Sequence, residues 1–324
     1  MYRRQIMREK NFLDIDEQIN KMKSLNIKIH NSKKTREKLQ ENSYYNIMNG
    51  YREPFLFNKH KNKYLRGTAF TEIYALYHFD RQLRQLLLSF LLEVENSFKT
   101  KIIYEFMQTK NSNGEYIHHS DDYLKIDNFD VDCNVNSRKN GSILEMIANM
   151  QRTISKNFYQ SDAISHYLTK YGYVPLWVIA TRMTFGDICT FYECCKSNNR
   201  QAVAKEYKMS DMDLLTHMRL LSFARNHCAH GNRVYCLKKR NDLPLPNKVH
   251  YPVQHQLIIA NQGKHNLLNV YISLKFFLSK KRYQELLLKT KGLFITLASR
   301  LETIGVQDIY NITGLPYDMI GLNN

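Results

Sequence analysis

The feature that most constrains the fold of this chain is a long segment, from Thr68 to Met107, in which apolar residues recur at helical spacing. The stripe in its second half consists of Leu87, Leu91, Val94, Phe98 and Ile102. Glycine and proline, which interrupt helices, number only 12 and 6 among the 324 residues. The sequence therefore predicts an all-α fold of long helices rather than a turn-rich β fold.

Three charged residues interrupt the apolar face of this segment. Asp80, Arg84 and Glu95 project within about 60° of one another at 100° per residue. Charges on an apolar stripe are costly unless they are paired. Asp80 and Arg84 are four residues apart and can pair on the helix, whereas Glu95 needs a partner from elsewhere, for which Arg225 is a candidate. A purely structural network of ion pairs is the alternative interpretation.

A second helix, expected from Met212 to His230, carries the residues with the clearest chemical meaning. Its apolar stripe contains the positions Leu214, Met218, Leu221, Arg225 and Cys228. Arg225 therefore stands where a leucine would be expected. A guanidinium at such a place needs a carboxylate, or else it faces a polar cleft.

The end of this second helix is expected to present a histidine. Asn226 and His230 are four residues apart and share a face, and Gly231-Asn232 is a plausible helix stop. His230 would then lie at an accessible helix end, which suits a general acid or base that works near neutral pH. His227 is a competing candidate, but its spacing puts it on the far side of the helix from Arg225.

These residue types suit the cleavage of RNA without a metal, in which the 2′-hydroxyl of the RNA attacks the adjacent phosphate. His230 would move protons, and Arg225 would stabilise the charge on the pentacoordinate phosphate. Asn226 would orient His230 or hold a phosphate oxygen. The polar residues of the long helix would support the site from behind, and these are Asp80, Arg84 and Glu95. An arginine five residues before a histidine is by itself a weak signal, so a structural role stays open.

Composition narrows the possible partners. A formal charge of +17 raises the odds of a polyanionic partner, with RNA, DNA and an anionic membrane surface all open, although an Asn/Lys-rich genome gives the same bias. We expect no signal peptide, and no stretch approaches the roughly 20 apolar residues that a membrane span needs. The six cysteines form no CxxC pair and no set with zinc spacing. We therefore expect a cytoplasmic protein with reduced thiols, no membrane partner, no metal and no cofactor.

The chain divides into three parts on its pattern. We expect an N-terminal basic helical subdomain (1–65), a helical domain (66–310) with a polar insertion (108–141), and a C-terminal tail (311–324). In the first part, Asp16 is expected to cap a helix and a second helix to run from Ser32 to Met48. In the second part, Pro175 is expected to start a helix that residues 185–187 interrupt, and closing helices are expected at 269–278 and 281–304. Basic residues after the histidine motif are candidates for contact with RNA, namely Arg233, Lys238, Lys239 and Arg240.

The segment Leu220-Leu221-Ser222-Phe223-Ala224-Arg225-Asn226-His227-Cys228-Ala229-His230-Gly231-Asn232-Arg233-Val234-Tyr235 resembles the signature of the abortive-infection (Abi) family of the AbiD/AbiF-like type, within the HEPN superfamily. The resemblance extends over about residues 12–305. Its further landmarks are Asp16 to Ile29, Tyr44-Tyr45, Gly50-Tyr51, Tyr77, Asp80, Leu83-Arg84, Glu95, Pro175, Trp177 and Phe185-Gly186. Asp187 departs from the pattern, which has a small hydroxyl or neutral residue there.

The resemblance implies an all-helical fold with a HEPN-type four-helix core and an RNA-directed role in bacterial defence against phage. It implies that Arg225 and His230 are catalytic, with Asn226 beside them, and that two copies form a homodimer. The first hypothesis is thus an endoribonuclease toxin or defence effector. The alternative is an RNA-binding protein that holds a structured small RNA, with the HEPN site silent or inhibited by that RNA.

Overall fold

The computed structural model describes residues 11–58, 62–109, 116, 122–134, 137–237 and 267–317. Regular structure in these residues is helical, apart from an antiparallel ribbon of β1 (Leu56–Asn58) and β2 (Lys63–Tyr64) in which Leu56 lies opposite Tyr64. The prediction of an all-α fold is confirmed. None of the described helices combines the length and apolar character that a membrane span requires.

The α-helices, in chain order, are α1 (Ile15–Ser24), α2 (Ser32–Asn42), α3 (Phe70–Met107), α4 (Arg138–Asn157), α5 (Asp162–Tyr171), α6 (Leu176–Ile179), α7 (Phe185–Cys194), α8 (Ser197–Glu206), α9 (Asp211–Ala229), α11 (Leu267–Phe277), α12 (Lys280–Ala298) and α13 (Val306–Thr313). Short turns of wider or tighter helix are η1 (Tyr45–Asn49), η2 (Glu53–Phe55), η3 (Asp122–Leu124) and η4 (Ile126–Asn128).

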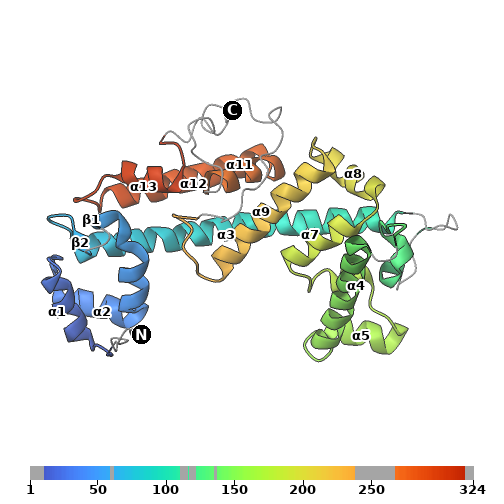
Figure 1. Cartoon of the computed structure of the whole chain (residues 1–324), viewed down its shortest axis with the longest axis horizontal. Coiled ribbons are helices and arrows are strands. Elements are labelled where there is room, and N and C mark those ends of the chain that lie inside the picture. The colour runs from blue at the N-terminus through green and yellow to red at the C-terminus, as the bar shows by residue number, and fades with distance from the viewer. Residues whose placement is uncertain are drawn as a thin grey trace, which may run out of the picture.

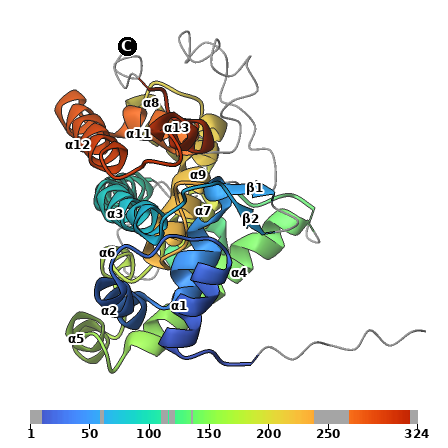
Figure 2. The same cartoon turned by 90° about the vertical axis from the view of Figure 1, so that its left-hand side faces the viewer.

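Helix α3 is the axis of the molecule (Figure 1). Helices α9 and α12 both pack on it, and α9 crosses it obliquely near its middle. The view along α3 shows α9 and α12 against different sides of this helix (Figure 2). Helices α1 and α2 lie near one end of α3, and α4, α5 and α7 lie toward the other. Every later element of the candidate site is positioned relative to this one helix.

The long helix forms because its apolar stripe is buried over most of its length. The five predicted stripe residues are at most 2% exposed and belong to one continuous hydrophobic core that extends from Ile19 to Leu315. Burial of each such side chain contributes roughly 1.5–3 kcal/mol. The prediction of a helix from Thr68 to Met107 is confirmed, with its first residue at Phe70.

Two predictions for the N-terminal helices are wrong in detail. Asp14 rather than Asp16 caps α1, because the Asp14 carboxylate accepts from the Glu17 N–H at 2.8 Å and the Glu17 carboxylate accepts from the Asp14 N–H. The helix expected to reach Met48 ends at Asn42, where Ser43 adopts a positive φ of 54°. That conformation breaks the helix, and the chain continues into η1.

A third correction concerns the start of α7. Phe185-Gly186-Asp187 begins this helix instead of interrupting one, because Thr184 and Asp187 form a reciprocal capping box. The Asp187 carboxylate accepts from the Thr184 N–H at 2.8 Å, and the Thr184 hydroxyl accepts from the Asp187 N–H at 3.2 Å. The acidic residue that departs from the family pattern therefore has a local structural function.

The remaining predictions concern the C-terminal helices and the domain boundaries. The last closing helix, expected to reach Ile304, ends at Ala298, and α13 continues past residue 311, where the tail was expected to begin. The division into subdomains stays a prediction. Much of the 108–141 insertion, and residues 238–266, lie outside the described residues.

Candidate functional site

Helix α9 ends as the sequence predicts, and its end presents His230. Gly231 takes a left-handed φ of 72°, and the Asn232 N–H folds back to the His227 carbonyl at 3.0 Å. This bond pattern with a left-handed glycine is a common helix stop, since glycine has no Cβ to oppose it. His230 is the capping residue itself and is exposed.

Arg225 is held by a buried carboxylate from the long helix. Its Nε donates to Glu95 Oε2 at 3.0 Å, and its Nη1 donates to Asn226 Oδ1 at 3.3 Å. Glu95 is 4% exposed, whereas the Arg225 side chain keeps 25% of its surface open. The predicted pairing of Arg225 with Glu95 is confirmed. The guanidinium has five N–H donors, and these two bonds do not use all of them.

The same carboxylate also binds a lysine, which the sequence analysis did not anticipate. Lys99 Nζ lies 3.4 Å from Glu95 Oε1 and donates to the Met183 carbonyl at 2.9 Å. The two oxygens of Glu95 thus each face a cation, and both cations are mostly buried. The only sequence signal for Lys99 is its position one helical turn after Glu95.

Asp80 is the centre of a second, separate network. Its Oδ1 accepts from the N–H groups of Val234 and Tyr235 at 2.9 and 2.7 Å. Its Oδ2 accepts from the Tyr51 hydroxyl at 2.7 Å and from Arg84 Nη1 at 2.8 Å. The predicted pairing with Arg84 is confirmed. Burial raises the pKa of Asp80, and these four donors oppose that rise.

Tyr51 is the member of this network that sequence reasoning missed. Besides its bond to Asp80, its ring stacks on Tyr235 with centroids 5.5 Å apart. Burial, and then the charge of Asp80, raise the pKa of Tyr51, so its hydroxyl stays protonated and donates. Tyr51 thereby joins the N-terminal helical part to the loop that follows His230.

The expected single group of supporting residues is therefore divided between two places on α3. Asp80 and Glu95 are fifteen residues apart, which is about 22 Å along a helix. Glu95 holds Arg225 within α9, and Asp80 holds the backbone of Val234 and Tyr235 just beyond His230. Helix α3 thus fixes both ends of the segment that contains the motif.

The side chains of the three candidate catalytic residues do not form one connected network. Among the contacts of the described residues, the Asn226 side chain bonds Arg225, but no side-chain hydrogen bond links His230 to either of them. The Asn226 carbonyl accepts the backbone N–H of His230 at 3.0 Å, as expected for the last helical turn. The catalytic roles of these three residues stay predictions.

His227 has the environment of a packed side chain. Its ring lies 4.2 Å from that of Phe223, centroid to centroid. Burial lowers the pKa of His227, a bond with the Phe223 backbone opposes this, and the charge of nearby His230 lowers it further. The neutral form of His227 is therefore favoured.

The basic residues expected to contact RNA are only partly described. Arg233 Nη1 donates to the Gly50 carbonyl at 2.7 Å, so this side chain also ties the loop after α9 to the N-terminal part. Lys238, Lys239 and Arg240 lie outside the described residues. Their predicted role as RNA contacts stays a prediction.

The site combines hydrogen-bond donors, one of them a cationic guanidinium, with a histidine that can carry a proton. An anchored guanidinium, an amide and an exposed imidazole are groups that bind and transform a phosphate ester. Within the described ranges, no group of three or more His, Cys, Asp or Glu side chains is placed to hold a metal ion.

Comparison with known proteins places these features in a family. No curated protein and no solved structure matches the chain. A family model described as "Abi-like protein" matches residues 37–236. The matched range contains α3, α9, both carboxylate networks and the whole Arg225–His230 motif. Because the match covers more than half of the sequence, the chain belongs to the Abi-like protein family.

Proposed function

We propose that this chain is a metal-independent endoribonuclease of the HEPN type that acts in abortive infection. Membership of the Abi-like family supports the role in abortive infection. The observation that carries the enzymatic part is the guanidinium of Arg225, fixed by Glu95 and Asn226 yet partly open, on a helix that ends at the exposed His230. An anchored arginine costs little reorganisation when charge develops on a bound phosphate.

The proposed reaction is an internal transfer within the RNA. The 2′-oxygen forms a bond to phosphorus, the bond from phosphorus to the 5′-oxygen breaks, and a 2′,3′-cyclic phosphate and a free 5′-hydroxyl result. One proton leaves the 2′-hydroxyl and one reaches the 5′-oxygen. His230 carries one of these protons, while Arg225 stabilises the phosphorane through charge-assisted hydrogen bonds.

A homodimer completes this proposal. One chain supplies one exposed histidine at the end of α9, whereas the reaction needs an acid and a base. A second copy would bring a second His230 and a second Arg225 to the same phosphate, as the resemblance to HEPN nucleases implies. The dimer is expected to be required for cleavage, and mixing an Arg225→Ala chain with the parent chain should lower the rate per parent subunit.

The test is RNA cleavage by the purified chain in the presence of EDTA. We expect products with 2′,3′-cyclic phosphate ends. Arg225→Ala and His230→Ala should each lower the rate by about 10²–10³-fold, the usual effect of removing a charge-stabilising donor or a general acid–base group. Rates are read from labelled single-stranded RNA on denaturing gels, and end groups from mass spectrometry.

Two matched variants separate catalysis from general damage to α9. Arg219→Ala removes an exposed cation from the same helix, where it pairs with Glu193, and should leave the rate within twofold. His227→Ala removes the packed neighbour of His230 and should retain most activity. Equal cleavage by the parent and by Arg225→Ala would refute the assignment. Tight RNA binding without turnover by the parent would favour the silent RNA-holding alternative.

A further inference from the structure

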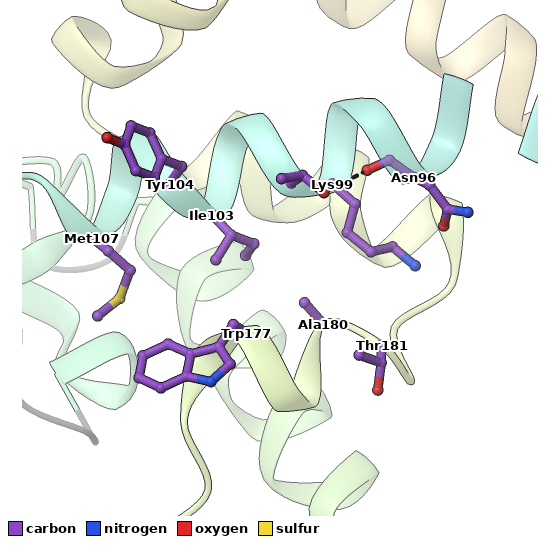
Figure 3. Close-up of a pocket in the computed structure, with 9 residues that line it drawn as sticks. Asn96, Lys99, Ile103, Tyr104, Met107, Trp177, Ala180 and Thr181 are labelled. Carbon is purple, nitrogen blue, oxygen red and sulfur yellow. Dashed lines mark hydrogen bonds between the residues drawn. The ribbon is translucent and has the colours of Figure 1, made fainter. Parts of the chain in front are cut away.

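A groove opens between α3 and the α6 segment, next to the Glu95 carboxylate. Its volume is about 600 Å³, within the range of small-molecule sites. Figure 3 shows α3 along one wall and Trp177 on the facing segment. The residues that line the groove include Asn96, Lys99, Ile103, Tyr104, Met107 and Trp177.

Two large aromatic side chains at this groove are left open to solvent. Trp177 is 51% exposed and Tyr104 is 62% exposed, although aromatic rings gain strongly from burial. Ile103 is buried beneath them and Met107 is partly buried, so the groove has an apolar floor. Such a surface suits a flat ring that can stack between or upon these side chains.

Polar groups at the groove can form hydrogen bonds with the edge of such a ring. Within the described part of the chain, the Asn96 amide, the Tyr104 hydroxyl and the Trp177 indole N–H have no hydrogen-bond partner in the protein. The Thr100 hydroxyl donates to the Asn96 carbonyl at 2.9 Å and still has lone pairs to accept. A purely aliphatic ligand would leave these groups unpaired, whereas a nucleobase presents donors and acceptors along its edge.

The groove is connected to the candidate site through one carboxylate. Lys99 lines the groove, and its ammonium contacts Glu95 Oε1 at 3.4 Å. The other oxygen of Glu95 holds Arg225 at 3.0 Å. Only the side chains of Lys99 and Glu95 therefore separate a ligand in the groove from the Arg225 guanidinium. The formal charge of +17 on the chain attracts polyanions such as RNA.

We propose that this groove is a nucleobase subsite, which takes the base of a nucleotide next to the phosphate bound by Arg225. The proposal rests on the proposed ribonuclease function and adds to it a preference for unpaired bases. Stacking on Trp177 and Tyr104 requires a base that is free of a duplex, so the substrate class is single-stranded RNA or an unpaired loop.

The test uses Trp177, which is the only tryptophan in the sequence and therefore the only source of indole fluorescence. A short single-stranded 2′-O-methyl RNA, which lacks the attacking hydroxyl, is titrated into the parent chain and into Arg225→Ala. We expect saturable quenching in both. Tyr104→Ala should weaken the affinity about 5- to 150-fold, as expected from the ~1–3 kcal/mol of one stacked base. An abasic oligonucleotide of equal charge should not quench.

The matched control is Tyr116→Ala, which removes another exposed aromatic outside the groove and should leave the affinity unchanged. RNA that binds by anisotropy without quenching Trp177 would overturn the proposal. A shift of tryptophan emission that follows protein concentration without RNA would also overturn it, because a second copy would then cover the groove. If RNA quenches Trp177 but the parent chain never cuts RNA, the proposed ribonuclease function is refuted and the nucleobase subsite is not.

Discussion

Glu95 and Asp80 are two acidic side chains of helix α3 that differ in what they bind. Glu95 faces two cations, Arg225 and Lys99, whereas Asp80 accepts from two backbone N–H groups as well as from Arg84. Both are nearly inaccessible to water, at 4% and 0% exposure. Loss of one partner from such a buried group is costly, because the charges that remain are left without compensation.

Glu95→Gln is the sharpest substitution at this scale. It keeps the size of the side chain but leaves Arg225 and Lys99 without a buried countercharge. We expect the cleavage rate constant to fall at least tenfold with little change in KM, since the guanidinium loses its fixed orientation. We also expect the free energy of unfolding to fall by about 1–3 kcal/mol. The measurements are single-turnover kinetics and urea denaturation.

Glu93→Gln is the matched control for this substitution. Glu93 lies two residues before Glu95, on the exposed side of α3, and pairs with Arg282, where both side chains are more than a third open to solvent. Exposed pairs contribute at most about 1 kcal/mol. Equal effects of the two variants on cleavage would contradict the proposed orienting role of Glu95.

The contacts of single residues could be predicted only where helical spacing constrained them. The pairing of Asp80 with Arg84 followed from their four-residue separation, and that of Glu95 with Arg225 from two charges on apolar stripes. The bonds from Asp80 to Val234 and Tyr235 involve backbone groups, which no residue pattern reveals. The exposure of Trp177 could not be predicted from the sequence either, because a tryptophan in an apolar run is usually expected to be buried.

At the scale of elements, the prediction of α3 and α9 succeeded because apolar periodicity decides where long helices form. It failed where local hydrogen bonds decide the boundary. Ser43 ends α2 through a positive φ, and Thr184 with Asp187 starts α7 through a capping box. Neither residue type marks such a boundary uniquely, so the sequence could not assign these ends.

The stop after α9 gives a testable contrast between two glycines. Gly231→Ala places a Cβ on a residue with φ of 72° and should destabilise the protein by about 1 kcal/mol. Gly292→Ala lies inside α12, where an added Cβ meets nothing within 4 Å, and should stabilise it by up to about 1 kcal/mol. Thermal unfolding of both variants tests whether the two changes in stability have opposite signs.

A loss of stability at both positions would show that Gly292 has a packing function. A neutral result at Gly231 would show that the helix end relaxes, and the position of His230 would then not depend on this turn. Cleavage by the Gly231→Ala chain is expected to fall in parallel, since the capping residue next to it carries the imidazole.

At the scale of the whole molecule, Glu72 ties the start of α3 to a loop near the other end of the chain. Its carboxylate is 2% exposed and accepts from the N–H groups of Glu302 and Thr303 at 2.8 and 2.7 Å. Burial acts to raise the pKa of Glu72, but the donors from Thr303, Glu302 and Ala69 lower it below its usual value.

This shift gives the protein a dependence of stability on pH. Because folding lowers the pKa of Glu72, its carboxylate contributes stability at pH values above its usual pKa of 4.5, and that contribution is lost as the pH falls through the lowered value. Glu72→Gln should therefore cost about 1–3 kcal/mol at pH 7 and much less near pH 3. Urea denaturation at the two pH values measures the difference.

Glu37→Gln is the control, since it removes an exposed carboxylate of α2. Its effect on the free energy of unfolding should be within about 0.5 kcal/mol at both pH values. A cost of Glu72→Gln that is the same at pH 7 and pH 3 would mean that the charge of this carboxylate is not what binds the 302–303 loop.

Because Asp80 and Glu95 both hold the segment that contains the motif, the spacing between them along α3 is fixed. One residue added between Asp80 and Glu95 would rotate the rest of α3 by about 100° and advance it by 1.5 Å. Glu95, Lys99 and the wall of the groove would then all turn away from their partners together. This stretch of the gene should accept substitutions but not insertions or deletions, even where its exposed positions vary freely.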